Sequence, residues 1–448
     1  DTQMSTNPPA RETTSPGARQ GMCVPAVLFG VVVVFLAQGI LERVVRRAQQ
    51  GFAPPGSNVQ TLAASTLILP ALQVAVCILF LFPWALLGDR YGPRLPYAGG
   101  LFVWALGVFA GSWSGSAEFL LASYALQAAG VAAVLPAALA VVTNAQSYRG
   151  GFLTGLVIAF PALLHLPGSL IADLMARSMD WRAALLLISV AAVPPLILGW
   201  LAIPSGPVEA GPDDGPAPES RPGRGRTVVQ TLLLGAVLFG FRIHLELAFS
   251  AHYDQLTLSG AAGYFRAHNG LVNFPFIAGL AAGFVVGAMI AGGRTNTWLA
   301  WLIAATGVGI ASVPLLPFDI AVLTGAVLAS AGLGIGLSGQ LVALLRLAAG
   351  NRISRAAALF QVAQNLGYGV GIGVPMALIL ALGDTVTPDA RVHLFLGCSL
   401  ILLVTGLVLA LRKPKNRVAA QRDSEEQTKR RIQSPRPGKP VTTSAKQK

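Results

Sequence analysis

An arginine and a glutamate four residues apart interrupt a long apolar stretch of this sequence. Arg242 and Glu246 lie between Phe241 and Leu247, and residues at this spacing share one face of a helix. A carboxylate held away from water takes up a proton more readily than one in solution, and a neighbouring arginine opposes that uptake. The pair thus has the chemistry of a reversible proton site, with His244 on nearly the opposite face. A static ion pair, or a stretch at the membrane interface, is the alternative.

A histidine and several aspartates complete the ionisable residues near the apolar segments. His165 lies between Pro161 and Pro167, which predict helix kinks. It is a second candidate for binding a proton or the substrate. The alternative is a structural histidine whose hydrogen bonds are all made to neighbouring residues. Glu246 is the only acid that we place well inside an apolar segment. Five aspartates fall at or beyond the outer ends of segments, where hydration and capping explain them: Asp173, Asp254, Asp319, Asp384 and Asp389.

The sequence lacks the motifs of most catalytic classes. It contains no phosphate-binding P-loop, so ATP is not expected to drive it. It has no Ser/His/Asp spacing and no metal-ligand pattern, and its cysteines sit in or beside separate apolar segments, as small buried residues do: Cys23, Cys77 and Cys398. We therefore expect no enzyme, no cofactor and no metal site.

The elements that position these residues are twelve apolar segments between Gly21 and about Leu411. Charged residues make up 11% of the chain, against about 25% in soluble domains, and the mean hydropathy is +0.63. A helix needs about 20 apolar residues to cross a bilayer. We predict an all-α membrane protein whose spans cover 22–42, 62–88, 96–113, 117–142, 151–173, 183–203, 228–250, 270–292, 297–316, 319–346, 356–382 and 392–411.

Arginines are more frequent in the loops of one side, and this asymmetry predicts the orientation. With both termini cytoplasmic, most loop arginines face inward, and the main exception is the cluster Arg43, Arg46 and Arg47 after the first segment. The net charge of +13 lies largely in such loops and in the C-terminal tail. No nucleic-acid partner is therefore expected.

A polar stretch rich in Gly, Pro, Asp and Arg divides the spans into six and six, as a flexible linker does. We expect five regions. They are a disordered cytoplasmic N-tail (1–21), a six-helix bundle (22–203), a cytoplasmic linker (204–227), a second six-helix bundle (228–411) and a disordered basic cytoplasmic C-tail (412–448).

Two six-span halves joined by a linker resemble the major facilitator superfamily of secondary transporters. The loop after the second span carries the resemblance further, because Asp89, Arg90, Gly92 and Arg94 are similar to the family signature G-x-x-x-D-R-x-G-R-R. Ala85 and Pro93 depart from it. The resemblance implies a gating motif in which Asp89 pairs with an arginine across the interface. The corresponding loop of the second half, Gly287 to Arg294, has no acid, and an ordinary positive-inside loop is the alternative.

The fourth and eleventh spans resemble those of drug:proton antiporters. Gln127 and Gly130 match the signature R-x-x-Q-G-x-G-x-A, but Tyr124 replaces its arginine. A face of small residues for helix packing explains the same pattern. The fifth span, with Gly151 and Gly155 near its start, is more loosely similar to the antiporters. Further candidate cavity residues, with His244, lie on the eleventh span: Gln361, Gln364 and Asn365.

The resemblance implies proton-coupled efflux of a small organic compound across the cytoplasmic membrane. Uptake or facilitated diffusion of a small polar or anionic solute, with Arg242 binding the anionic group, is the first alternative. A receptor or scaffold without flux is the second, which the Asp89-Arg90 motif disfavours because a static protein has no use for a gate. The expected partners are a small-molecule substrate, protons and the lipid bilayer, and the expected state is a monomer.

Overall fold

The structure is a computed structural model of the chain. It describes residues 16–52, 59–144, 150–206, 224–255, 269–290, 297–312, 318–348, 352–382 and 388–411. Residues 1–15 of the predicted N-tail, the predicted C-tail at 412–448, most of the linker, and Arg294 of the second-half loop lie outside the described residues. Residues 16–21 of the predicted N-tail belong to the first helix instead.

The described residues form helices and no strands, which confirms the predicted all-α membrane fold. Ten helical segments are long and apolar enough to cross a membrane, and Phe274–Ile290 and Thr297–Ser312 are shorter apolar helices. The first half contains α1 (Pro16–Phe52), α2 (Val59–Tyr91), α3 (Arg94–Ser112), α4 (Ala117–Asn144), α5 (Gly150–Ser178), α6 (Trp181–Ala191) and α7 (Val193–Ala202). The second half contains α8 (Arg224–Gln255), α10 (Asn269–Ile290), α11 (Thr297–Ser312), α12 (Phe318–Leu347), α13 (Ile353–Leu382) and α14 (Pro388–Leu411).

The sixth predicted span is made of two successive helices. α6 and α7 meet at Ala192, two residues before Pro194 and Pro195. Proline has no backbone N–H to continue the helical ladder, so an interruption here is expected. Together the two helices form one apolar span, Trp181–Ala202, and every predicted span then has a helix.

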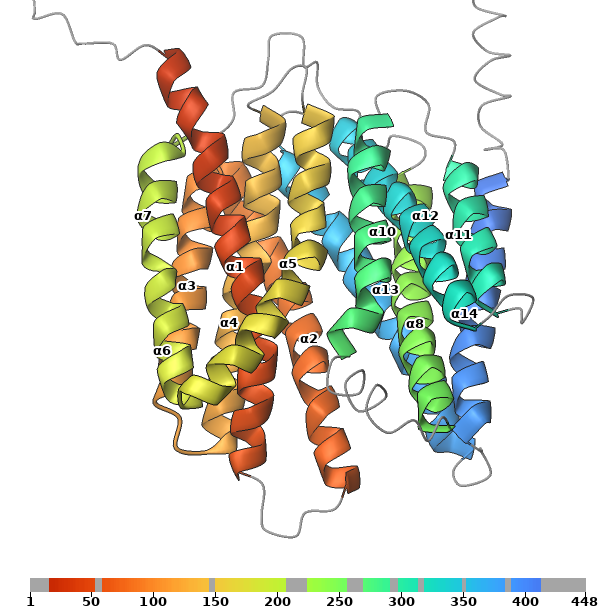
Figure 1. Cartoon of the computed structure of the whole chain (residues 1–448). Helices are drawn as coiled ribbons and strands as arrows, with labels where there is room; N and C mark the ends of the chain where they lie inside the picture. Colours follow the sequence, from red (N-terminus) through yellow and green to blue (C-terminus); the bar gives the residue numbers. More distant parts are fainter. Residues whose placement is uncertain are drawn as a thin grey trace, which may run out of the picture.

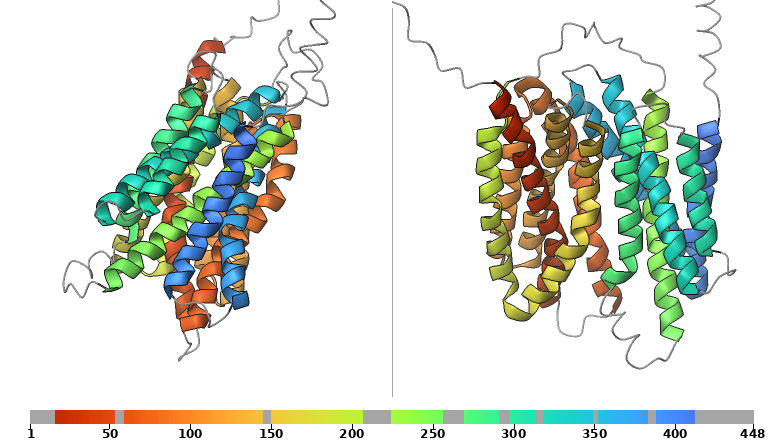
Figure 2. Two further views of the ribbon diagram at one scale, coloured as in Figure 1. Left: turned by 90° about the vertical axis from the view of Figure 1, so that its right-hand side faces the viewer. Right: turned by 45° about the horizontal axis from the view of Figure 1, so that its top comes forward.

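The helices stand side by side in two bundles (Figure 1). α1 to α7 form one half and α8 to α14 the other. The main contacts between them are α5 against α10 and α2 against α13, and α13 also packs on α4. The right-hand view of Figure 2 shows the same two groups of helices. The central cavity described below lies where these four helices approach α1, α4 and α8.

Glycines allow close packing at the same place in each half. A Cβ on Gly130 of α4 would lie 2.4 Å from the backbone nitrogen of Trp104 in α3. A Cβ on Gly332 of α12 would lie 2.4 Å from the backbone nitrogen of Ala304 in α11. Gly130 therefore has the packing role that we gave as the alternative to a functional signature.

The first helix is longer than the sequence predicted. We ended its span at residue 42 and placed Arg43, Arg46 and Arg47 in an outer loop, but α1 continues to Phe52. All three arginines lie on this helix and bond to an acidic group or a carbonyl. These bonds offset the cost of placing guanidinium groups on a bundle helix. The three arginines therefore belong to the first bundle and not to an outer loop.

The predicted linker is shorter at its C-terminal end, because α8 begins at Arg224. Arg226 lies in the first turn of α8 and donates to the carbonyl oxygens of Leu409 and Ala410, at 2.5 and 2.8 Å. These carbonyls belong to the last turn of α14 and have no partner within their own helix. Arg226 thus fastens the first helix of the second half to its last.

Candidate central cavity

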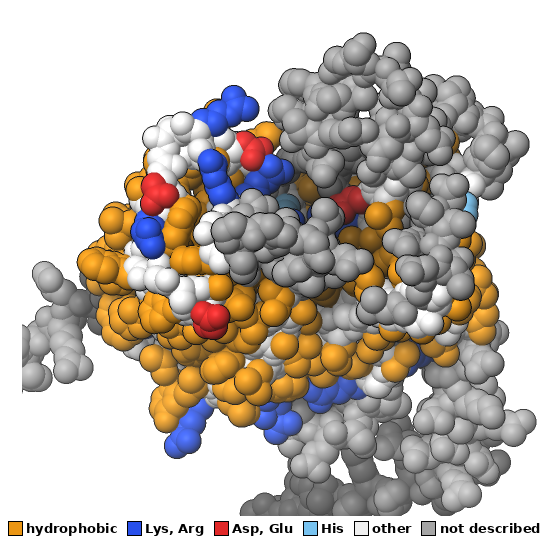
Figure 3. Space-filling model, turned by 90° about the horizontal axis from the view of Figure 1, so that it is seen from below, with side chains coloured by type: hydrophobic (Ala, Val, Ile, Leu, Met, Phe, Trp, Pro, Cys, Tyr) orange, Lys and Arg blue, Asp and Glu red, His pale blue; other side chains and the backbone are white. Residues whose placement is uncertain are grey.

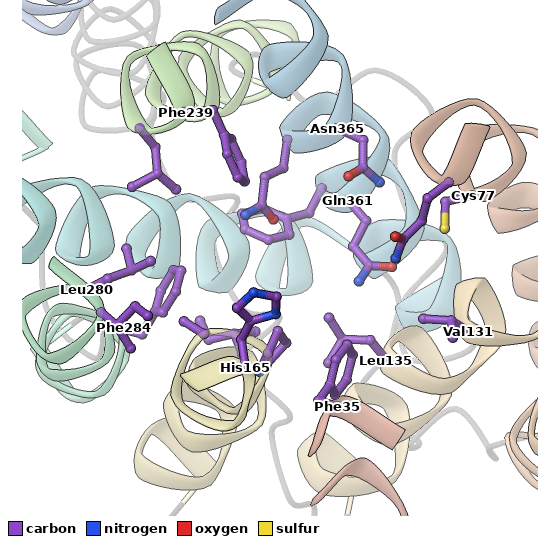
Figure 4. Close-up of a pocket in the computed structure, with 18 of the residues that line it drawn as sticks. Phe35, Cys77, Val131, Leu135, His165, Phe239, Leu280, Phe284, Gln361 and Asn365 are labelled. Carbon is purple, nitrogen blue, oxygen red and sulfur yellow. The ribbon is translucent and has the colours of Figure 1, made fainter. Parts of the chain in front are cut away.

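A cavity of about 290 Å³ lies between the two halves (Figure 4). Ligand pockets in proteins usually measure about 300–1,000 Å³, so this space suits a small organic molecule. Seven helices contribute to its wall: α1, α2, α4 and α5 from the first half, and α8, α10 and α13 from the second. A solute in this cavity would contact both halves at once.

Most of the cavity wall is apolar and much of it is aromatic. The phenylalanines that line it are Phe35, Phe239, Phe276, Phe284 and Phe360. The wall also carries four amides and two basic side chains, namely Gln73, Gln361, Gln364, Asn365, His165 and Arg242. Figure 4 shows His165 and Gln361 pointing into the same space from α5 and α13. The wall can therefore bind an apolar body and also orient a polar group.

The halves are packed tightly at the end of the cavity nearest the linker. Cβ atoms on Gly151 and Gly155 of α5 would lie 2.8 Å from the Ala288 oxygen and the Val285 Cα of α10. On the other side, a Cβ on Gly88 of α2 would lie 2.9 Å from the hydroxyl of Ser354 in α13. The glycines of the fifth span, which the sequence linked to antiporters, thus bring the two halves together here.

An ion pair lies in the same contact. The carboxylate of Asp89 in α2 accepts a hydrogen bond from Nε of Arg355 in α13, and Ser354 also bonds to it. The Asp89 side chain is only 6% exposed. A charge-assisted bond at such a place stabilises the contact between the halves, and it breaks if the halves separate at this end.

The other residues of the Asp89 loop build its turn. Gly92 has φ +86°, which favours glycine, and a Cβ there would lie 1.9 Å from the carbonyl oxygen of Gly206. Arg94 stacks its guanidinium 4.2 Å from the ring centre of Trp200 in α7. Arg90 is exposed and lies against Tyr91. Among the described residues, Asp89 is the motif residue that makes a polar contact with the second half.

A charged cluster on α1 and α5 lies away from this sealed end. Glu42 pairs with Arg46, and its other oxygen lies 3.4 Å from Nε2 of His165. Arg43 donates to both oxygens of Asp173, at 2.7 and 2.8 Å. Figure 3 shows the molecule from the end opposite the sealed one, and acidic and basic side chains lie together there among hydrophobic ones.

Two predictions about acids are wrong here. Glu246 is not the only acid inside a span, because α1 continues as an apolar helix past Glu42. Asp173 is not at a helix end, because α5 continues to Ser178, and it is paired with Arg43. Sequence reasoning missed both pairs because each joins residues more than 100 positions apart or depends on where a helix ends.

The predicted pair on α8 is formed. Nε of Arg242 donates to Oε1 of Glu246 at 3.2 Å, with the side chains 31% and 35% exposed. Arg242 lines the cavity, whereas Glu246 is not among the lining residues. The charge of Arg242 also acts on His165 across the cavity and on Tyr368 of α13. The basic groups that the sequence singled out thus meet at one site.

Three predicted cavity residues do not line this cavity. Tyr124 is buried and donates its hydroxyl to Oε1 of Gln73 at 2.8 Å, so it supports a lining residue from behind. Gln127 is buried against α3 and donates to the Gly107 oxygen at 3.4 Å. His244 is buried and stacks on Phe241 at 5.9 Å between ring centres. The predicted lining by Gln361, Gln364 and Asn365 agrees with the cavity wall.

Sequence analysis also overlooked Gln73, Glu42 and Arg355. Gln73 carried a usable signal, because it is an amide inside an apolar run of α2. Glu42 carried the same signal as Glu246, an acid and an arginine four residues apart. Arg355 gave no such signal, because its role depends on its position opposite Asp89.

Comparison with known proteins agrees with this architecture. Residues 27–372 match the family model for the Major Facilitator Superfamily. Similar solved structures include FucP of E. coli in the outward conformation, at 16% identity and TM-score 0.60 over 88% of this chain and 100% of that one. The human organic anion transporter MFSD10 (TETRAN) has 15% identity and TM-score 0.65 over 88% and 100%. The proton:xylose symporter XylE has 13% identity and TM-score 0.61 over 87% and 95%.

At these identities the similarity to solved structures concerns the fold alone, and no curated protein matches the chain in sequence. The family match covers most of the chain and coincides with the two helical halves, the cavity between them and the Asp89 loop. The chain belongs to the Major Facilitator Superfamily, a family of transporters and not of enzymes.

Proposed function

We propose that this protein is a secondary transporter that carries a small organic solute by alternating access, coupled to protons. The observation that carries the proposal is the cavity between two halves that are tightly packed at one end. Among the described residues, α1 and α8, the first helices of the halves, make no extended contact with one another. Rocking of the halves about the cavity would open the packed end and close the other.

Proton coupling has two candidate sites beside the cavity. One is the Arg242–Glu246 pair on α8, and the other is Glu42 with Arg46 and His165. Each holds a carboxylate next to a basic group on a bundle helix, so protonation changes the local charge balance. FucP and XylE are proton symporters, and a proton-coupled mechanism is compatible with this fold.

The direction of transport depends on how proton binding and solute binding are coupled, and there are two candidates. Proton-driven efflux of an amphiphilic compound, as the antiporter-like spans predict, needs a site that binds proton and solute in alternation. Uptake of an anionic solute is the second candidate, because an arginine lines the cavity and the described part of the wall contains no acid. Both candidates use the same cavity and the same alternating movement.

Reconstitution in proteoliposomes tests the proposed function. Counterflow with a compound panel should identify a solute that the wild type exchanges, and an imposed pH gradient should drive its net movement. A gradient that accumulates the solute on the alkaline side indicates movement together with protons, and accumulation on the acidic side indicates exchange. Failure of every compound in counterflow by a folded protein would contradict transport.

The orientation of the sealed end is part of the proposal. With the linker in the cytoplasm, the cavity of this structure would be reached from outside. A cysteine at Ser205 should react with an impermeant maleimide only after the cells are permeabilised. Labelling in intact cells would reverse the assigned topology.

A further inference from the structure

The cavity wall is asymmetric in charge. Among the described residues, the basic side chains of Arg242 and His165 line the cavity, whereas the carboxylates paired with them, Glu246 and Glu42, do not. A solute in the cavity therefore meets positive charge first. Resting on the proposed transport function, we infer that the cavity binds an amphiphilic monoanion whose charged group is held by Arg242, and that Glu246 takes up a proton as the anion binds.

The shape and polarity of the wall favour a small amphiphile with an aromatic or branched body. Phenylalanines from α1, α8, α10 and α13 surround the cavity, and aromatic faces bind apolar rings with a modest additional gain over simple burial. The amides of Gln361, Gln364 and Asn365 lie on one helix, α13. They can donate to an oxyanion or to neutral oxygen atoms of the same solute.

Arg242 can reach a ligand without leaving its helix. Its side chain is 31% exposed, and its bond to Glu246 uses Nε. Among the described residues, its two terminal nitrogens make no hydrogen bond. A guanidinium has five N–H donors in a planar fork that suits carboxylate and sulfonate oxygens. The arginine can therefore contact an anion while it is still next to Glu246.

Binding of an anion makes Arg242 serve two negative groups. The anion brings a second negative charge close to Glu246, and a like charge close by favours the protonated form of a carboxylate. Glu246 is the carboxylate in reach of that proton, because the ligand anion is held by the arginine. The other groups around the site are His165 of α5, Tyr368 of α13, and, around His165, Glu42, Arg43 and Arg46.

The charge balance of the loaded cavity then has a direct consequence for coupling. One anion enters with one proton from solution, and the proton is transferred to a Glu246 oxygen while no covalent bond of the ligand changes. The loaded carrier has the same net charge as the empty one. This arrangement favours movement of anion and proton together, whereas exchange would require the proton to leave as the solute binds.

Two probes with the same body and opposite permanent charges test the inference. They are 3-phenylpropane-1-sulfonate and trimethyl(3-phenylpropyl)ammonium, and neither can carry the proton itself. Calorimetric titration of the purified protein in lipid nanodiscs gives the affinity, and repetition in buffers of different ionisation enthalpy gives the protons taken up. We expect the sulfonate to bind with uptake of close to one proton and the ammonium compound to bind far more weakly.

Three variants assign the result to residues. Arg242→Gln should weaken sulfonate binding about ten- to a hundredfold, as expected for loss of a charge-assisted bond. The sulfonate affinity of Arg242→Lys should lie between those of Arg242→Gln and the wild type, because the charge remains and the planar fork of donors is lost. Glu246→Gln should bind the sulfonate at least as tightly as wild type but without proton uptake. Arg226→Ala, which alters an arginine far from the cavity, is the matched control and should bind as wild type.

Several outcomes would overturn the inference. They are stronger binding of the ammonium probe, no sulfonate binding by folded wild type, equal affinity in Arg242→Gln, or proton uptake that persists in Glu246→Gln and so belongs to His165 or Glu42. Melting curves of each variant show that it is folded. If neutral or cationic compounds exchange in counterflow and the sulfonate does not, the inference fails while the transport function stands.

Discussion

The first helices of the two halves carry the same pair of residues in opposite order. On α1, Glu42 precedes Arg46 by four positions, and on α8, Arg242 precedes Glu246 by four positions. On α8 the arginine lines the cavity and the acid does not. On α1 neither residue lines it, and the acid lies against His165, which does.

This difference indicates a division of work between the halves. The α8 pair presents a cation directly to a solute, whereas the α1 pair reaches the cavity only through His165. The α1 pair is also joined to a second ion pair, Arg43–Asp173, which fixes α1 against α5. We expect the α8 pair to respond to the solute and the α1 pair to set the electrostatic background of His165.

The scaffold beneath these pairs is the same in both halves. α3 packs on α4 where Gly130 meets Trp104, and α11 packs on α12 where Gly332 meets Ala304. α3 and α11 also each bury one tryptophan completely, Trp104 and Trp301. The two halves thus share their packing and differ in the residues that face the cavity and the interface.

The largest effect is expected from breaking the shared packing. In Gly130→Leu and Gly332→Leu, the new Cβ would lie only 2.4 Å from a backbone nitrogen of the neighbouring helix. Overpacking usually costs about 1–3 kcal/mol, and a clash with backbone exceeds that range. Both variants should lose most of the folded protein in fluorescence-detected size-exclusion chromatography. Gly309→Leu, at a position with open space around it, is the control and should stay folded.

Neutralising each acid in turn shows which of the two pairs, Arg242–Glu246 or Glu42–Arg46, carries the coupled proton. Glu246→Gln should abolish accumulation driven by a pH gradient yet preserve counterflow, because glutamine resembles the protonated acid. Glu42→Gln should retain gradient-driven accumulation at a reduced rate, because its side chain acts through His165. Proteoliposome assays with any exchanged solute give both readouts. The reverse result, with Glu42→Gln uncoupled and Glu246→Gln coupled, would transfer the proton site to α1.

The interface ion pair is the next test, because only the first half supplies its acid. Asp89→Asn should reduce the transport rate strongly while the melting temperature changes little. The lost bond is worth about 1.5–3 kcal/mol to the packed end, so the resting balance of the two conformations should shift. Asp89→Arg combined with Arg355→Asp, which restores opposite charges, should recover part of the rate. Wild-type rates in Asp89→Asn would show that the pair does not gate.

The smallest effects concern two arginines that bond to the last turn of another helix. Arg226 donates to two carbonyls of α14, and Arg47 donates to the Ala176 oxygen of α5 at 2.7 Å. Arg226→Ala should destabilise the protein by about 1–2 kcal/mol. Arg47 is exposed, so Arg47→Ala should cost less than about 1 kcal/mol. Thermal unfolding in detergent measures both, and an equal or larger effect of Arg47→Ala would contradict this order.

The polar residues show how far sequence reasoning reached into the site. Arg242, His165 and the amides of α13 were found because a polar side chain inside an apolar helix has a cost that function can explain. Tyr124, Gln127 and His244 satisfied the same criterion and yet do not line the cavity. Their burial against a neighbouring helix depends on helix rotation, which periodicity of an almost wholly apolar segment does not define.

The sequence by itself determined the membrane class, the helical spans and the position of the Asp89 loop. Each follows from local physics, because a bilayer demands long apolar helices and a tight turn demands Gly92. The tertiary structure decided where α1 ends, which acid meets which base, and which side chains face the cavity. Those features depend on contacts between residues far apart in the chain, such as Asp89 with Arg355 and Arg43 with Asp173. Only the packing of one helix on another brings such partners within bonding distance.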